Sequence, residues 1–236
     1  MAAASPDPME MLKAATSSEA EMKEELIKAS ARIVLSVILG LTAVFFLFWP
    51  SKKGIVKQLI TRERRSVVKY KTGVDGKVPG FVVTRSLEAA IHAPNHFLNE
   101  PWRFRVLGPE TVKKIVVLNE AKKELFEGVP GWMLVSVVLT PGDTKWNPKA
   151  LEDHAATACA VQNFMLALAS EGFASKWMTG AMGIPAAKLL EVAGVAEKDE
   201  HFMGILFMGK PATPTAKMDV PKRKVGIAEP VLTRLP

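Results

Sequence analysis

The feature that most constrains this 236-residue chain is a run of seventeen uncharged residues, Ile33–Trp49, fourteen of which are apolar. A helix rises about 1.5 Å per residue, so this run spans ~26 Å, close to the ~30 Å hydrocarbon core of a bilayer. Lys52 and Lys53 follow almost at once, as is typical of a membrane–water boundary. The run predicts a single membrane anchor, and the alternative is a buried helix of a globular core.

The basic residues that flank the run predict its orientation. Three of them precede it, at positions 23, 28 and 32, and six follow it, at positions 52, 53, 57, 62, 64 and 65. Lys and Arg are enriched on the cytoplasmic side of a membrane segment, so we expect a single-pass membrane protein whose C-terminal domain faces the cytoplasm. The acidic residues before the run argue against a cleaved signal peptide or an organellar transit peptide.

The net charge of +7 belongs entirely to residues 54–236, where 25 basic residues face 18 acidic ones. Such an excess predicts an anionic partner, and composition alone leaves nucleic acid, a membrane surface and a phosphorylated small molecule open. The single cysteine, Cys159, excludes an internal disulfide and a cysteine-rich zinc site. We expect a polar segment at 1–32, a transmembrane anchor at 33–49 and one mixed domain at 55–236.

Hydrophobic periodicity in that domain predicts an α+β fold. Helices are expected at Ile55–Arg64, Glu110–Phe126, Ala150–Glu171 and Ala186–Val192, and Leu87–His92 is expected to be the end of a further helix that Pro94 stops. Buried strands are expected at Arg103–Leu107, Trp132–Leu139 and Phe202–Met208. The helix at Ala150–Glu171 is apolar or small nearly all round, so we expect it deep in the core with Cys159 buried.

Several well-known sites are missing from the sequence. It contains no GxGxxG after a strand, no GxxxxGK[ST], no GxSxG and no HExxH. These absences argue against a Rossmann dehydrogenase, a P-loop NTPase, an α/β-hydrolase and a zincin. His92 and His96 have a spacing that suits a metal on a helix, but Pro94 breaks the helix between them, so no metal site is predicted.

The triplet Arg64-Arg65-Ser66 ends the first expected helix of the domain. Two guanidinium groups and a hydroxyl are a donor set that can saturate phosphate oxygens. The alternative is a solvated basic turn, and the triplet alone does not decide between the two.

Four further motifs follow in order, and with the triplet they carry a resemblance. They are A-P-N-H-F-L-N-E-P-W-R-F at Ala93–Phe104, the segment Gln162–Thr179, the strand ending in G-K-P at Gly204–Pro211, and the basic arm at Lys222–Lys224. The sequence therefore resembles the nitroreductase family of FMN-dependent oxidoreductases over essentially all of residues 55–236. The A-P-x-H form is most similar to the compact branch of that family.

The resemblance implies a central sheet flanked by helices and a homodimer with FMN at its interface. It implies an enzyme that takes electrons from NAD(P)H, with NADH and NADPH both open, and passes them to a nitroaromatic, quinone or similar acceptor by a ping-pong mechanism. The cofactor carries this chemistry, so no catalytic side chain is expected. A flavin phosphate would explain part of the positive charge, so nucleic acid is not expected as a partner.

The resemblance also implies roles for individual residues. Arg64, Arg65 and Ser66 would hold the FMN phosphate and the ribityl or pyrimidine oxygens. His92 and His96 would contact flavin, His96 from the partner subunit. The positions expected along the isoalloxazine ring are Trp177, Met178 and Thr179, and Arg223 matches a phosphate-binding arginine of the C-terminal arm. Trp102 is expected to anchor the core.

The chain departs from many members of the family in one place. The segment between Trp102 and Leu134 is short, whereas many members have a longer helical excursion there that covers the substrate. We therefore expect either an open and unselective pocket or only weak activity. Three alternatives remain: a flavin-binding scaffold protein without turnover, a reductive dehalogenase of the iodotyrosine deiodinase type, and a basic membrane-surface module without a cofactor.

Overall fold

The computed structural model describes residues 8–48, 60–139 and 147–221. The chain divides into two compact units, Met1–Ile55 and Val56–Pro236. The first unit contains one helix of 41 residues, α1 (Pro8–Phe48). The second unit contains the sheet and the remaining helices.

The prediction of a membrane-spanning anchor is contradicted by α1. Among the residues that the structure describes, no helix combines the length and the apolarity that crossing a membrane demands. Of the predicted span, the structure describes the side chains of residues 33–42. The remaining predicted positions, 43–49, lie outside the described side chains. The predicted single-pass location with a cytoplasmic domain is therefore wrong.

The second unit is built on a four-stranded antiparallel sheet. Its strands are β1 (Trp102–Val106), β2 (Gly131–Val138), β3 (Ala174–Met178) and β4 (Glu200–Gly209). They lie in the order β1-β2-β4-β3, so β2 and β4 are central while β1 and β3 form opposite edges. The register pairs Trp102 with Val137 and Leu134 with Ile205. Three of these strands were predicted, and β3 was not.

The alternation of side chains along the two central strands explains why both read as continuous apolar runs. Trp132 and Leu134 face one hydrophobic cluster, whereas Met133 and Val135 face a second cluster on the other side of the sheet. Successive side chains of a strand point to opposite faces, so a strand covered on both faces must be apolar at every position. The sheet is therefore the middle layer of the unit.

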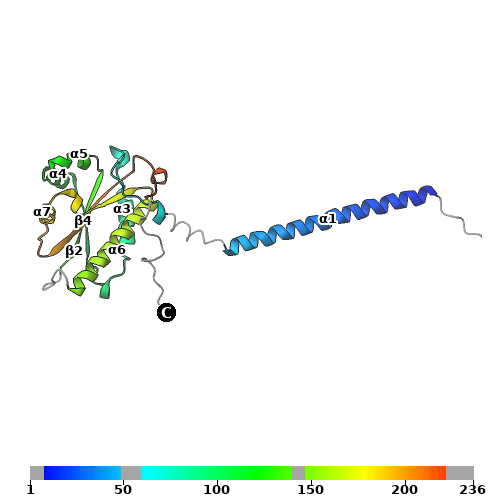
Figure 1. The fold of residues 1–236 in the computed structure, drawn as a ribbon, viewed down its shortest axis with the longest axis horizontal. Helices are drawn as coiled ribbons and strands as arrows, with labels where there is room; N and C mark the ends of the chain where they lie inside the picture. The colour runs from blue at the N-terminus through cyan, green and yellow to red at the C-terminus, as the bar shows by residue number, and fades with distance from the viewer. Residues whose placement is uncertain (1–7, 49–59, 140–146, 222–236) are drawn as a thin grey trace, which may run out of the picture. The chain divides into compact units, whose positions relative to one another are not determined.

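Helices α3 (Gly80–Ala90) and α6 (Pro148–Ser170) pack together on one face of the sheet (Figure 1). Asn147 caps α6: its side-chain oxygen accepts hydrogen bonds from the backbone N–H groups of Lys149 and Ala150, at 2.7 and 3.2 Å. Pro148 occupies the first helical position, where its missing N–H costs nothing. Trp102 packs in the same layer and is buried, which confirms its predicted role as a core anchor.

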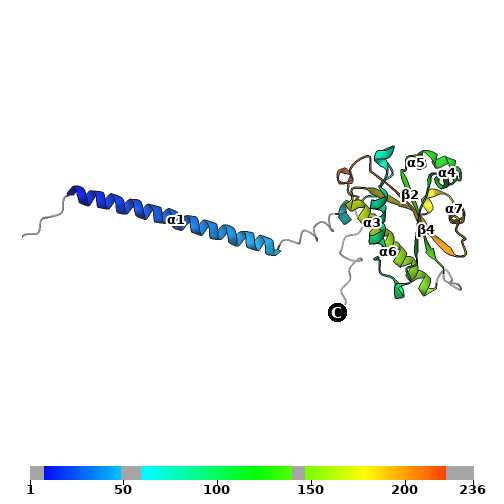
Figure 2. The same cartoon turned by 180° about the vertical axis from the view of Figure 1, so that it is seen from behind.

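The other face is covered by α4 (Pro109–Val117), α5 (Lys123–Glu127) and α7 (Ala186–Val192), which group together in both views (Figures 1 and 2). The predicted helix at Glu110–Phe126 is broken into two. Asn119 leaves the helical conformation, and its side-chain amide donates to the carbonyl oxygen of Met182 at 2.8 Å. The predicted bounds of α7 are confirmed.

The segment between β1 and β2 contributes to the core. Ile115 and Phe126 are completely buried against the sheet, and Phe126 lies edge-on to Trp132. The apolar side chains of this segment therefore close one face of the sheet and support the fold directly. The structure confirms an α+β fold with an antiparallel sheet flanked by helices.

Helix α6 is less buried than its composition predicted. One face packs on the sheet, while the opposite face exposes Leu151, Glu152, Ala155, Cys159 and Gln162. The prediction that Cys159 is buried is wrong. Small residues such as Ala155 and Cys159 occur both in cores and on surfaces, so residue type alone did not distinguish this exposed face from a buried one. Five short turns of 3-10 helix complete the unit: η1 (Val74–Gly76), η2 (His96–Leu98), η3 (Glu120–Lys122), η4 (Gly180–Met182) and η5 (Thr215–Lys217).

Candidate functional site

The Arg64–Ser66 triplet lies beside β3, at one edge of the sheet. The helical turn that precedes it ends at Glu63, and Ser66 forms an isolated bridge with Ser175. The backbone N–H of Val67 donates to the carbonyl oxygen of Ser175 at 3.2 Å, and the Val67 side chain is buried. Burial of Val67 and pairing with β3 therefore fix the triplet in place.

The triplet lines a pocket of about 360 Å³, whose other walls are Met218, Asp219 and Pro221. The Arg65 guanidinium donates to three backbone carbonyl oxygens: that of Asp219 at 3.4 Å, that of Arg64 at 3.1 Å, and that of Arg62. Backbone carbonyl oxygens carry no net charge, so they orient the guanidinium group without neutralising its positive charge. The pocket thus offers two arginines and a hydroxyl to an anion, next to one acidic residue.

The chemistry of this donor set suits a flavin phosphate. Bidentate guanidinium groups match phosphate oxygens, and a serine hydroxyl adds a further donor. Next to Ser66, the side-chain oxygen of Ser175 is buried and has no hydrogen-bond partner. Ser175 is 1% exposed and does not line the pocket, so the donors that the pocket offers to an anion are those of the triplet. The residues present therefore fit FMN.

The predicted site residues 177–179 lie at the end of β3, and they differ in which of their groups a ligand can reach. Trp177 is partly buried on the α6 face, and its indole N–H donates to the carbonyl oxygen of Met203 at 2.9 Å. The Met178 side chain is buried in the opposite cluster, so only its backbone is available to a ligand. Thr179 follows the strand and is exposed.

The end of β4 also reaches this edge. The backbone N–H of Lys71 donates to the carbonyl oxygen of Lys210 at 2.9 Å, and Tyr70 forms a bridge with Pro211. Tyr70 is buried, which raises the pKa of its phenol, and its hydroxyl donates to the carbonyl oxygen of Val67 at 2.7 Å. Three of the sequence motifs are thus brought together at the β3 edge.

The two predicted histidines lie between α3 and β1 in the chain. His92 is exposed at the end of α3. The exposed His96 lies 2.6 Å from Glu152 of α6, measured between Nδ1 and Oε2. The structure therefore places His96 at the start of α6, whereas Ile60 and Thr61, which lead into the arginines, line a pocket with Ala167 and Ser170 at the end of α6.

The loop that carries His96 is strained. Phe97, Leu98 and Glu100 have positive φ angles of 50°, 54° and 45°. The side chains of Phe97 and Leu98 are 92% and 80% exposed. Asn99 donates from its amide to the buried carboxylate of Asp153 at 2.6 Å, so α6 holds both ends of the exposed apolar pair. Such strain persists only where surrounding contacts impose it, and it clusters at functional sites.

Sequence reasoning missed several residues around these sites. Ser175 belongs to the motif Gln162–Thr179. Its spacing of two residues from Trp177, which is the spacing of side chains on one face of a strand, is the signal that could have identified it. Glu152 and Asp153 belong to a helix that seemed uniformly apolar or small, and nothing local connects them with residues 96 and 99. Asp219 has no sequence signal. Arg223 of the predicted arm lies outside the described residues.

Comparison with known proteins identifies the family to which this chain belongs. The sequence model of the Nitroreductase family matches residues 145–210. YfhC of Bacillus subtilis (strain 168), whose name proposes an NAD(P)H nitroreductase, is 32% identical over 183 residues, covering 70% of this chain and 89% of YfhC. The chain therefore belongs to the nitroreductase family.

Solved structures show the same fold. A nitroreductase-like protein from Bacillus cereus superimposes with a TM-score of 0.62 at 24% identity, covering 76% of this chain and 95% of that one. A second, from Desulfovibrio desulfuricans and described as a complex with FMN, gives a TM-score of 0.61 at 24% identity, covering 76% and 96%. The predicted family is confirmed.

Proposed function

We propose that this protein is an FMN-dependent oxidoreductase that takes electrons from NAD(P)H. The observation that carries the proposal is the convergence of Arg64–Ser66, β3 and the end of β4 at one edge of the sheet, around a pocket with an anion-binding donor set. Family membership and the name of YfhC support the electron donor, and the FMN complex of a structural neighbour supports the cofactor. We assign the activity to residues 55–236.

We infer that Arg64, Arg65 and Ser66 hold the FMN phosphate and nearby oxygens. Trp177, the Met178 backbone and Thr179 would flank the ring, and Arg223 would add a further charge to the phosphate. Bound FMN supplies the hydride and electron chemistry. The chain's own contribution is to orient the cofactor and to stabilise negative charge on it with the two guanidinium groups.

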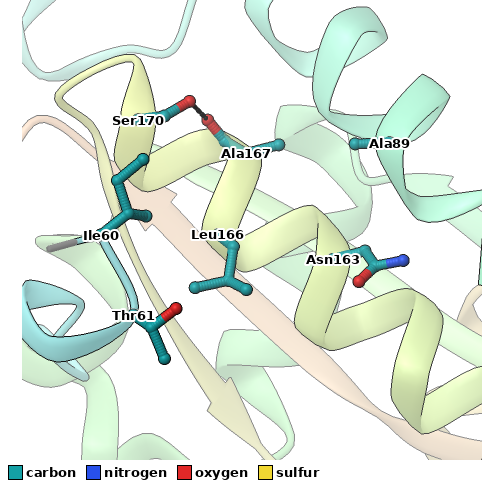
Figure 3. Close-up of a pocket in the computed structure, with 7 residues that line it drawn as sticks. All are labelled: Ile60, Thr61, Ala89, Asn163, Leu166, Ala167 and Ser170. Carbon is teal, nitrogen blue, oxygen red and sulfur yellow. Dashed lines mark hydrogen bonds between the residues drawn. The ribbon is translucent and has the colours of Figure 1, made fainter. Parts of the chain in front are cut away.

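The site is proposed to be completed by a second copy of the chain. Within one copy His96 lies at the start of α6 and the residues that precede the arginines lie at its end, so His96 would reach flavin from the partner. An apolar pocket of about 410 Å³ lies along α6 (Figure 3). It is lined by Ile60, Thr61, Ala89, Asn163, Leu166, Ala167 and Ser170. With the exposed face of α6, this pocket offers a surface for a homodimer of the compact A-P-x-H branch.

The acceptor is proposed to be a nitroaromatic, a quinone or a similar planar molecule. The segment between β1 and β2, which covers the substrate in many relatives, packs here against the sheet through Ile115 and Phe126. A pocket without that cover would admit varied acceptors. Donor and acceptor would use the same space in turn, which predicts ping-pong kinetics.

The test uses the purified full chain with FMN added, followed by NADH or NADPH and a quinone. We expect a yellow protein that oxidises one of the two donors and gives parallel lines in a double-reciprocal plot. A protein that cannot be loaded with FMN would contradict the proposal. FMN binding without turnover would identify a flavin-binding scaffold, and release of iodide from an iodotyrosine would identify a dehalogenase.

A further inference from the structure

Strand β4 contains one residue more than its partner β2 in the middle of their pairing. Val135 pairs with Gly204, whereas the next residue, Ser136, pairs with Phe202, so Met203 is left without a partner. This is a β-bulge, which bends a strand and re-aims nearby groups. Gly204 has a φ of +142°, a conformation that residues with a Cβ rarely adopt.

Met203 and Gly204, the two residues of the bulge, both lie against the side chain of Trp177. The Met203 carbonyl oxygen accepts the indole N–H of Trp177 at 2.9 Å. The indole also lies directly against Gly204: a Cβ added there would be 2.2 Å from Nε1 and 2.7 Å from Cδ1 of Trp177. Any side chain larger than hydrogen at position 204 would therefore displace the indole. The bulge provides both its hydrogen-bond acceptor and the space that it fills.

The indole belongs to the strand that the Arg64–Ser66 triplet meets. Side chains two residues apart in a strand share a face and are separated by about 7 Å. Ser175, where the Arg64–Ser66 triplet meets the strand, is two residues before Trp177. The pocket residue Ser66 therefore meets β3 two residues before the indole, a separation that suits a ligand with a phosphate at one end and a planar ring at the other.

We propose that Gly204 is a positioning residue for the cofactor: with the Met203 carbonyl, it fixes the Trp177 indole in the place where the flavin ring binds. The inference rests on the proposed function. The indole is only partly buried, so contacts with the core alone do not fix it, and its orientation depends on the bulge. A displaced indole would obstruct the ring while leaving the phosphate pocket intact.

The test compares four full-length proteins: wild type, Gly204→Ala, Trp177→Phe and Gly194→Ala. Gly194 is the matched control, because it also has a positive φ, of +73°, but a Cβ there would meet nothing within 4 Å. The measurements are the FMN dissociation constant, from the quenching of flavin fluorescence, and the absorption spectrum and midpoint potential of bound FMN. Trp177→Phe replaces the indole with a smaller aromatic ring and removes the N–H that binds Met203.

We expect Gly204→Ala to weaken FMN binding about tenfold or more and Trp177→Phe to shift the spectrum and potential of bound FMN, with Gly194→Ala within about twofold of wild type. Equal losses in Gly204→Ala and Gly194→Ala would overturn the inference, because backbone strain alone would then explain them. If Gly204→Ala does not fold, unchanged affinity and spectrum in Trp177→Phe would overturn it. A wild type that binds no FMN overturns the proposed function as well, whereas normal binding by all four proteins overturns the inference alone.

Discussion

Arg65 and Arg105 differ in their hydrogen-bond partners, and these partners determine whether the positive charge of each side chain is available to a ligand. Arg65 donates to backbone carbonyl oxygens, so its charge stays available to a ligand. Arg105 of β1 instead donates to both carboxylate oxygens of Glu200 at 2.7 Å, with Ser136 between them. The first residue belongs to a binding pocket, and the second ties β1 to β4 across β2.

Arg65→Ala should weaken FMN binding by about 1.5–3 kcal/mol, the usual value of a hydrogen bond to a charged group. Titration of the full chain with FMN measures the change. Arg85→Ala is the control, because Arg85 pairs with Glu171 on the surface, away from the pocket residues. Equal FMN affinity in Arg65→Ala and wild type would remove Arg65 from the site.

Glu200→Gln should lower the free energy of unfolding at pH 7 by about 2 kcal/mol. Burial raises the pKa of Glu200, but hydrogen bonds from Arg105 and Ser136 and the Arg105 charge outweigh it, so the pKa lies below its usual value. The stabilisation is therefore complete above a pH of about 4.3 and is lost as the pH falls through the lowered pKa. Urea unfolding at pH 7 and pH 3 should show the difference from wild type shrinking in acid. The exposed Glu197→Gln should show no such dependence.

At the scale of elements, the first turns of α6 have two tasks. They begin the helix that covers the sheet, and they hold the strained loop before β1 through Glu152 and Asp153. Lys149 adds a contact to the Asp153 carboxylate at 2.5 Å. The start of α6 therefore determines the position of His96 as well as the packing of the helix.

Asn147→Ala should cost about 1 kcal/mol of stability, because two backbone N–H groups at the start of α6 lose their acceptor. Thermal or urea unfolding measures the loss. Asn147→Asp keeps an acceptor at the same place and should retain nearly the full stability. A loss of the same size in both variants would show that the side chain has another role.

For the molecule as a whole, the two ends of α6 determine how a site can be assembled. His96 lies at the start of α6, Ile60 and Thr61, which precede the arginines, line a pocket at its end, and the helix exposes a face that includes Ala155 and Cys159. Two copies related by a twofold axis that bury this face would bring the start of α6 in one copy toward the end of α6 in the other. This arrangement would create two equivalent sites and cover Phe97 and Leu98.

Ala155→Glu should therefore convert the proposed dimer into a monomer and abolish FMN retention, because a buried unpaired carboxylate is costly at an interface. Light scattering after size-exclusion chromatography gives the mass. Val117→Glu, at an exposed apolar position of α4, is the control and should leave the mass unchanged. A wild type that is monomeric with FMN bound would contradict the dimer proposal.

Local sequence signals predicted much of the fold. The apolar runs at Trp132–Leu139 and Phe202–Met208 indicated the two central strands, because burial on both faces leaves no polar position. The five-residue β3 was missed because its Ser and Lys break that pattern and its strand conformation depends on pairing with β4. The membrane anchor was inferred from composition alone, and the described part of α1 contradicts it.

The sequence by itself determined the family and the order of its motifs, because those depend on residue types and their spacing along the chain. It could not determine which motifs meet. Only the tertiary structure showed that Ser66 lies beside Ser175, that Met178 turns into the core while Trp177 does not, and that a bulge at Met203 supports the indole. Those relations depend on strand order and register, which long-range packing decides.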